Sequence, residues 1–224
     1  MIFKILLKYI GVSLVISLIF GATVFTSSII KKRFKKDFIS QYLFQILSFI
    51  VFIIMLLYSK SNISIFSTHN LLNWKNIILL LVSIIPTSII AYNSHKIKPD
   101  YSFKLKHFLD GATMEIPQRL LVQNLFLVLG VNIVSYSLVP LNILLNAIIW
   151  LQFIIVQEII QGEKLSINIL PELIASFWFS IWVGILYQDA GNIIIPMLAH
   201  GFQRTCTYAI RKRFGKLNPS QTKI

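Results

Sequence analysis

The stretch "DGATMEIPQRLLVQNLFLVLG", residues 110–130, begins an apolar segment, yet it carries a carboxylate and a guanidinium four residues apart, Glu115 and Arg119. Pro117 lies between them. An ionised side chain at the centre of a membrane-spanning helix costs on the order of 3 kcal/mol on insertion scales. If this segment enters a membrane, both side chains therefore need a place away from lipid.

The composition predicts a membrane protein. Hydrophobic residues make up 56% of the 224 residues and charged residues 13%, and the mean hydropathy is +0.75. A soluble domain carries about a quarter charged residues. Apolar runs lie near residues 9–30, 41–59, 76–94, 112–132, 138–160, 168–187 and 191–210. Each is close to the roughly 20 residues that a spanning helix needs, and none alternates with a period of two. We expect an all-α polytopic transmembrane helix bundle of about seven spanning helices, although six or eight would also fit.

The placement of the charge predicts the orientation. The net charge is +13, and its basic residues cluster at Lys31–Lys36, His95–His107 and Arg211–Lys216. The connections between these clusters are poor in lysine and arginine, so alternate loops are basic, as in the positive-inside pattern. We expect a multi-pass protein of the cell membrane with these clusters and its C-terminus in the cytoplasm. Membrane topology explains the basic clusters, and we expect no nucleic-acid partner. The alternative is that the clusters bind anionic lipid or nucleic acid.

Three regions follow from this pattern: N-terminal transmembrane helices at 1–104, core helices at 105–210 and a basic cytoplasmic tail at 211–224. The single cysteine, Cys206, excludes an intramolecular disulfide and a cysteine-based zinc site.

Polar residues concentrate in the core helices. In the first half of 112–132 they are Glu115, Gln118, Arg119, Gln123 and Asn124. At about 100° per residue, Glu115, Arg119 and Gln123 lie within an arc of about 80°. Because two of the three are ionisable, we expect this face to point away from the lipid. Either Arg119 neutralises Glu115 and stabilises the start of the helix, or the pair marks a functional site.

Two further segments are expected to meet this face. Segment 138–160 carries Asn142, Asn146, Gln152 and Gln157. We interpret Asn142 and Asn146 as interhelical hydrogen-bonding residues. The expected lining of a substrate-binding or polar cavity is Gln118, Gln152, Gln157 and Arg204. Segment 191–210 places His200 in mid-helix, with Arg204 one turn later. Two helices with Glu/Arg and His/Arg predict a shared polar centre, opening toward the cytoplasm.

Residues "MEIPQRLLVQNLF" (114–126) and "FSIWVGILYQDAGNIIIPMLAHGFQRT" (179–205) resemble the CPBP family, also called Abi or CAAX-protease-like proteins. The resemblance covers about residues 105–210. It implies a polytopic intramembrane endopeptidase, often called a metalloprotease, that acts on membrane-associated or lipidated peptides. Bacterial members of the family are linked to bacteriocin self-immunity and to regulation of surface proteins or peptide signals.

The family signature is Glu-Glu-x-x-x-Arg, then Phe-x-x-x-His, then His-x-x-x-Asn/Asp. The resemblance assigns catalytic roles to Glu115, Arg119 and His200. Met114 stands where the first glutamate is usual, Arg204 stands in place of Asn or Asp, and no histidine occurs between His107 and His200. In the family, the first glutamate and the middle histidine activate water, and the last motif helps to bind the carbonyl or oxyanion.

These departures leave more than one function open. A hydrolytic zinc takes three protein ligands, and this chain offers Glu115 and His200, so we expect no metal site although the family name suggests zinc. The first hypothesis is an intramembrane endopeptidase. The alternative is a proteolytically inactive protein for bacteriocin self-immunity or for regulation of a partner membrane protein. A small transporter is a third hypothesis, without a motif. Expected partners are the lipid bilayer and a membrane peptide or membrane protein.

Overall fold

The computed structural model describes residues 2–34, 37–59, 63–67, 73–92, 104–131, 139–160 and 169–214. Regular structure in these ranges is helical, apart from one isolated bridge between Phe66 and Asn192. The expected all-α class is therefore confirmed. The basic clusters lie largely outside the residues whose side chains are described.

In chain order the helices are α1 (Ile2–Phe34), α2 (Asp37–Tyr58), α3 (Trp74–Tyr92), α4 (Lys104–Thr113), the π-helix η1 (Ile116–Gln123), α5 (Asn124–Val128), α6 (Leu141–Ile160), α7 (Leu170–Ala190) and α8 (Ile194–Phe214). The helices α4, η1 and α5 follow one another with only two residues between α4 and η1. Taken as one broken segment, they bring the described helices to seven helical segments, which match the seven apolar runs of the sequence.

Three helical stretches are long and apolar enough to cross a bilayer: Ile2–Ile30, Leu141–Ile160 and Leu170–Ala190. Two shorter apolar stretches, Tyr42–Tyr58 and Trp74–Ile90, accompany them. This is the pattern of a multi-pass membrane protein. The broken segment does not meet the same criterion because its helices α4, η1 and α5 have only 10, 8 and 5 residues, and α8 does not meet it either. Crossing by these two segments, and the direction in which the bundle is inserted, remain predictions.

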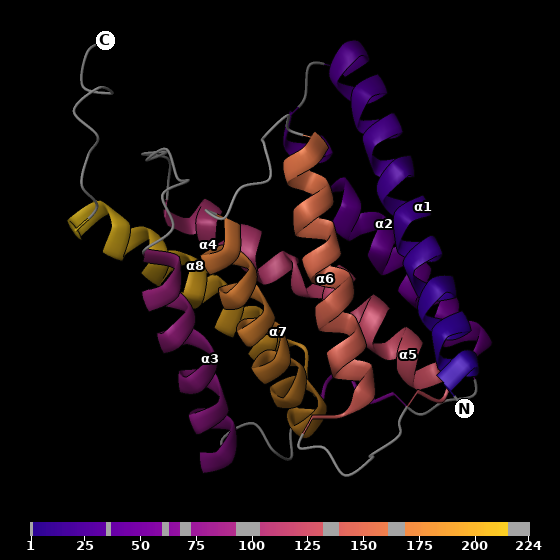
Figure 1. The fold of residues 1–224 in the computed structure, drawn as a ribbon. Helices are drawn as coiled ribbons and strands as arrows, with labels where there is room; N and C mark the ends of the chain where they lie inside the picture. Colours follow the sequence, from indigo (N-terminus) through magenta and orange to yellow (C-terminus); the bar gives the residue numbers. More distant parts are fainter. Residues whose placement is uncertain are drawn as a thin grey trace.

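Successive segments run in opposite directions through the bundle (Figure 1). The C-terminal ends of α1 and α6 lie at the top of Figure 1, that of α8 lies at the left, and the turn between α7 and α8 lies at the bottom. Helix α3 packs on α7 and α8, α4 packs along α8, α6 packs on α7, and α2 packs on α1 and η1. The broken segment therefore contacts helices on both sides of the bundle.

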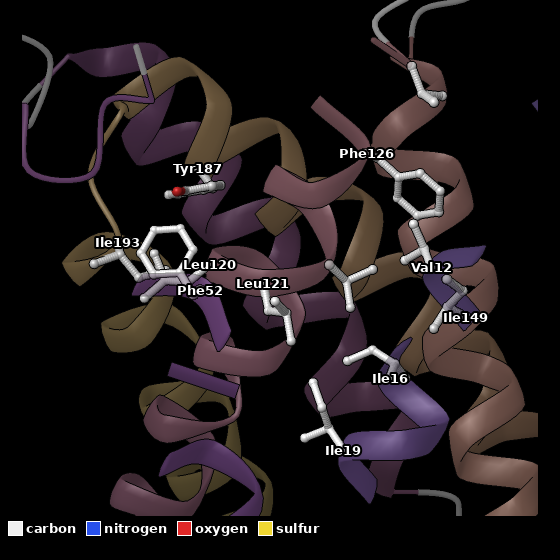
Figure 2. Packing of buried hydrophobic residues seen from close by; sticks show 12 residues of the cluster. Val12, Ile16, Ile19, Phe52, Leu120, Leu121, Phe126, Ile149, Tyr187 and Ile193 are labelled. Atoms are coloured by element: carbon white, nitrogen blue, oxygen red, sulfur yellow. The ribbon is translucent and has the colours of Figure 1, made fainter. Parts of the chain in front are cut away.

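The principal apolar core joins α1 and α2 to the broken segment and α6 (Figure 2). Its buried members include Val12, Ile16, Ile19, Phe52, Leu120, Leu121, Phe126, Ile149, Tyr187 and Ile193. The cluster contains residues from both sides of the predicted boundary at residue 104. Large apolar side chains such as Leu18 and Leu57 are exposed on the outer faces of α1 and α2. Exposed apolar faces of this kind suit contact with lipid tails.

A tight hairpin fixes α7 against α8. Gly191 has φ 58°, the left-handed conformation that favours glycine, and its N–H bonds to Tyr187 O at 2.9 Å, closing the C-terminus of α7. The segment before α3 pairs with this turn: Ile193 N–H donates to Ile65 O and Ser67 N–H to Gly191 O, both at 2.9 Å. The hairpin thereby sets the relative position of the α7 and α8 side chains that face η1.

Candidate functional site

The polar residues of the broken segment lie in a π-helix. The N–H of Asn124 bonds to the carbonyl of Arg119, five residues earlier. At the α-helical advance of about 100° per residue, the five polar residues from Glu115 to Asn124 would cover an arc of about 240°. The wider π-turn advances about 80° per residue and gathers them into about 120°. Pro117 lies at its start and supplies no N–H, which suits the first turn of a helix.

Glu115 is held between two basic side chains. Its Oε2 accepts a hydrogen bond from Arg119 Nε at 3.0 Å, and its Oε1 lies 2.6 Å from His200 Nδ1. Glu115 and Arg119 are fully buried, and His200 is 6% exposed. Carboxylate oxygens only accept, so Nδ1 carries the proton in this contact and the neutral imidazole keeps its lone pair on Nε2. The structure thus joins the two polar helices that the sequence predicted to meet.

Arg119 also binds neutral groups from three elements. Its NH1 donates to Gln123 Oε1 at 3.1 Å, and NH2 lies 3.4 Å from Ser180 Oγ. The Asn146 side-chain amide can be oriented so that it makes two hydrogen bonds. In that orientation Oδ1 accepts from Arg119 NH1 at 2.7 Å, and Nδ2 donates to the backbone carbonyl of Gln118 at 3.1 Å. A buried guanidinium needs such partners for its five N–H groups.

One face of α7 completes the cluster. Gln118 Nε2 donates to Ser180 Oγ at 2.7 Å, and Gln123 Nε2 donates to the carbonyl of Gly184 at 3.1 Å. A Cβ at Gly184 would lie 2.6 Å from Ile143 Cγ2 and 3.1 Å from Arg119 NH1, so glycine permits this close approach. Sequence reasoning did not single out Ser180 or Gly184. Their signal was a pair of small residues four apart in an apolar helix, which is common where transmembrane helices pack.

Met114 points to a different neighbour from Glu115. Its sulfur lies 3.4 Å from Gln45 Nε2 on α2. The position that the family resemblance gives to a first glutamate therefore contacts α2, whereas Glu115 contacts α8.

Three predicted residues lie outside this cluster. Gln152 and Gln157 are exposed on α6, and Arg204 is exposed on α8. On α6 it is Asn146, interpreted from sequence as an interhelical hydrogen-bonding residue, that contacts Arg119. Gln152 differs from Asn146 in helical phase, because six residues turn an α-helix by about 240°. Gln157 shares the phase of Asn146 but lies eleven residues, about 16 Å, farther along the axis. Gln118, also predicted as cavity lining, does belong to the cluster.

Of the groups that could take part in acid–base or metal chemistry, the cluster contains Glu115 and His200. In the described part of the chain, no three His, Cys, Asp or Glu side chains gather where they could hold a metal ion. The arrangement can fix the tautomer and the orientation of the His200 ring, because an acceptor on Nδ1 determines which nitrogen is protonated. The Phe179 ring, with its centroid 4.7 Å from that of His200, packs against the imidazole.

Comparisons with protein-family models, with curated proteins and with solved structures gave no match.

Proposed function

We propose that this chain is a CPBP-type membrane protein that binds a membrane-embedded peptide or partner protein at the Glu115–Arg119–His200 cluster without hydrolysing it. The observation that carries the proposal is the occupation of both Glu115 oxygens, by Arg119 Nε at 3.0 Å and by His200 Nδ1 at 2.6 Å. A role in self-immunity or in control of a partner membrane protein fits a site that binds and does not cleave.

The chemistry of hydrolysis argues for this choice. A general base must reach a water proton with a free lone pair. Each Glu115 oxygen already accepts from a basic side chain, which lowers the basicity of the lone pair that remains, and protonating the carboxylate would leave Arg119 as an uncompensated buried charge. Met114, at the position of the family's first glutamate, offers only a weak thioether acceptor.

His200 supplies the group that supports binding. Nδ1 is engaged by Glu115, whereas Nε2 makes no hydrogen bond to any residue that the structure describes. The ring is held by the carboxylate on one side and packs against Phe179. A fixed imidazole nitrogen can accept from a peptide N–H, or donate to a carbonyl when the ring is protonated. In the family pattern this histidine belongs to the motif that contacts the carbonyl.

The second candidate is the endopeptidase itself. The short contact between Glu115 and His200 favours it, since the resemblance places these residues in one active centre. In that case Glu115 orients or deprotonates water, and His200 polarises the scissile carbonyl.

The experiment measures binding and cleavage on the same samples. Detergent-purified protein is incubated with a fluorescent peptide library in farnesylated, geranylgeranylated and unmodified hydrophobic forms. Fluorescence anisotropy reports binding and mass spectrometry reports cleavage. Glu115→Ala and His200→Ala are compared with His107→Ala, which changes a histidine that stacks on Tyr208 outside the cluster.

We expect wild type and His107→Ala to bind one class of peptide intact, and the two site variants to bind about tenfold or more weakly. Cleavage by wild type that both site variants abolish would establish the endopeptidase instead. Equal binding by all four proteins, or no binding to any class, would contradict the proposed peptide site.

A further inference from the structure

A line of buried amide side chains runs from the Glu115 cluster toward the end of the bundle where α7 ends. Gln188 is exposed near the C-terminus of α7, and its Oε1 lies 3.4 Å from Asn142 Nδ2 on α6. Asn146 follows four residues after Asn142, on the same face of α6. It contacts Gln118 and Arg119. The line therefore connects an exposed amide to the charged centre.

Three buried amide oxygens on α6, η1 and α5 have no hydrogen-bond partner within the described residues. They are Asn142 Oδ1, Gln118 Oε1 and Asn124 Oδ1. Their side chains are 0%, 1% and 0% exposed, so lipid and bulk solvent do not reach them. Buried polar groups of proteins are nearly always satisfied by protein or by ordered water.

Exchanging the oxygen and nitrogen positions of these side-chain amides does not give every polar atom a hydrogen-bond partner. Asn142 and Gln118 each use one polar atom, on Gln188 and Ser180 respectively. Exchanging oxygen and nitrogen would leave the NH₂ group unpaired in place of the oxygen. Asn124 uses its NH₂ group twice, on the carbonyl of Leu120 and on the hydroxyl of Tyr187. In the orientations that the structure shows, the missing partner of each oxygen is a hydrogen-bond donor small enough for a buried site.

We propose that water molecules bind along this seam between η1, α5 and α6, and that they connect the Glu115 cluster to the aqueous phase at the Gln188 end. Water satisfies the requirement because it donates to an amide oxygen and accepts from an amide N–H. A cation is disfavoured by the Arg119 guanidinium, which lies 2.7 Å from the Asn146 oxygen. This proposal goes beyond peptide binding and does not depend on it.

Substituted cysteines test the proposal with neighbouring residues as matched controls. In a Cys206→Ala background, which removes the single cysteine, Asn142→Cys is compared with Ile143→Cys, and Asn146→Cys with Ala147→Cys. All four positions are at most 1% exposed. The probe is a small charged methanethiosulfonate, applied to membrane vesicles, with modification read by a mass shift.

We expect the two asparagine positions to react about tenfold or more faster than their neighbours, because a thiol must ionise and meet the reagent in water. The rate should fall from Asn142 to Asn146, with distance from Gln188. Equal rates within both pairs would overturn the proposal.

Radiolytic footprinting of the unsubstituted protein gives an answer even if the cysteine variants do not fold. Hydroxyl radicals formed from bound water label adjacent side chains. We expect labelling at Tyr187, which contacts Asn124, and none at Phe126, which is fully buried in the apolar core. Absence of label at Tyr187 would contradict a hydrated seam.

Discussion

Replacing Arg119 with methionine leaves Glu115 as a buried carboxylate without its guanidinium partner. Arg119→Met removes the 3.0 Å contact to Glu115 Oε2. It also leaves the side-chain oxygens of Gln123 and Asn146 without their hydrogen-bond donor. Breaking a buried ion pair by removing one member costs about 3–5 kcal/mol of unfolding free energy. Glu115→Leu leaves the Arg119 guanidinium buried without its carboxylate partner and should lower the free energy of unfolding by a similar amount.

The double variant should lose less unfolding free energy than the two single variants added together. With both charges gone, the remaining cost comes from the hydrogen-bonding groups of Gln123, Asn146 and His200 that lose partners, at about 1 kcal/mol each. We therefore expect a loss of about 3 kcal/mol for Glu115→Leu/Arg119→Met, against about 6–10 kcal/mol if the single changes were additive. The coupling free energy should be about 3–7 kcal/mol.

The assay is reversible unfolding in mixed micelles by titration with sodium dodecyl sulfate, followed by the fluorescence of the four tryptophans. A parallel cycle on the ion pair between the exposed Lys75 and the partly exposed Asp189 is the control, with an expected coupling below about 1 kcal/mol. Additivity within about 0.5 kcal/mol for Glu115 and Arg119 would refute the reasoning, because the two residues would then not form a buried pair.

Three further outcomes are expected. Gly184→Ala should destabilise the protein by about 1–3 kcal/mol in the same titration, because its Cβ would meet Ile143 and Arg119; Gly21→Ala, with open space around its Cβ, should be neutral or stabilising. His200→Gln should retain more stability than His200→Ala, since an amide N–H can still donate to Glu115; equal losses would show that this hydrogen bond contributes nothing. A green fluorescent protein fused after residue 224 should fluoresce in cells if the C-terminus lies in the cytoplasm, as the positive-inside pattern predicts. A fusion protein that is made but does not fluoresce would contradict that prediction.

Residues 116–123 form a π-helix and do not follow the α-helical period that the linear pattern predicts. An α-helical wheel brings Glu115, Arg119 and Gln123 together but turns Asn124 to the far side. In the π-helix Asn124 shares their side of the segment and reaches Tyr187 on α7. The opening of the cluster toward the cytoplasm stays a prediction. The contact of Asn142 with Gln188 lies near the C-terminus of α7.

The sequence alone determined the all-α class, the number of helical segments and the membrane environment, because these depend on local hydropathy and length. It also singled out Glu115, Arg119 and His200, since ionisable residues in apolar segments need partners. Only the tertiary structure decided which polar residues of α6 and α7 those partners are. That choice depends on helical phase, on the position of each residue along its helix and on close packing at Gly184. No local pattern fixes how one helix is rotated and shifted along its axis against another.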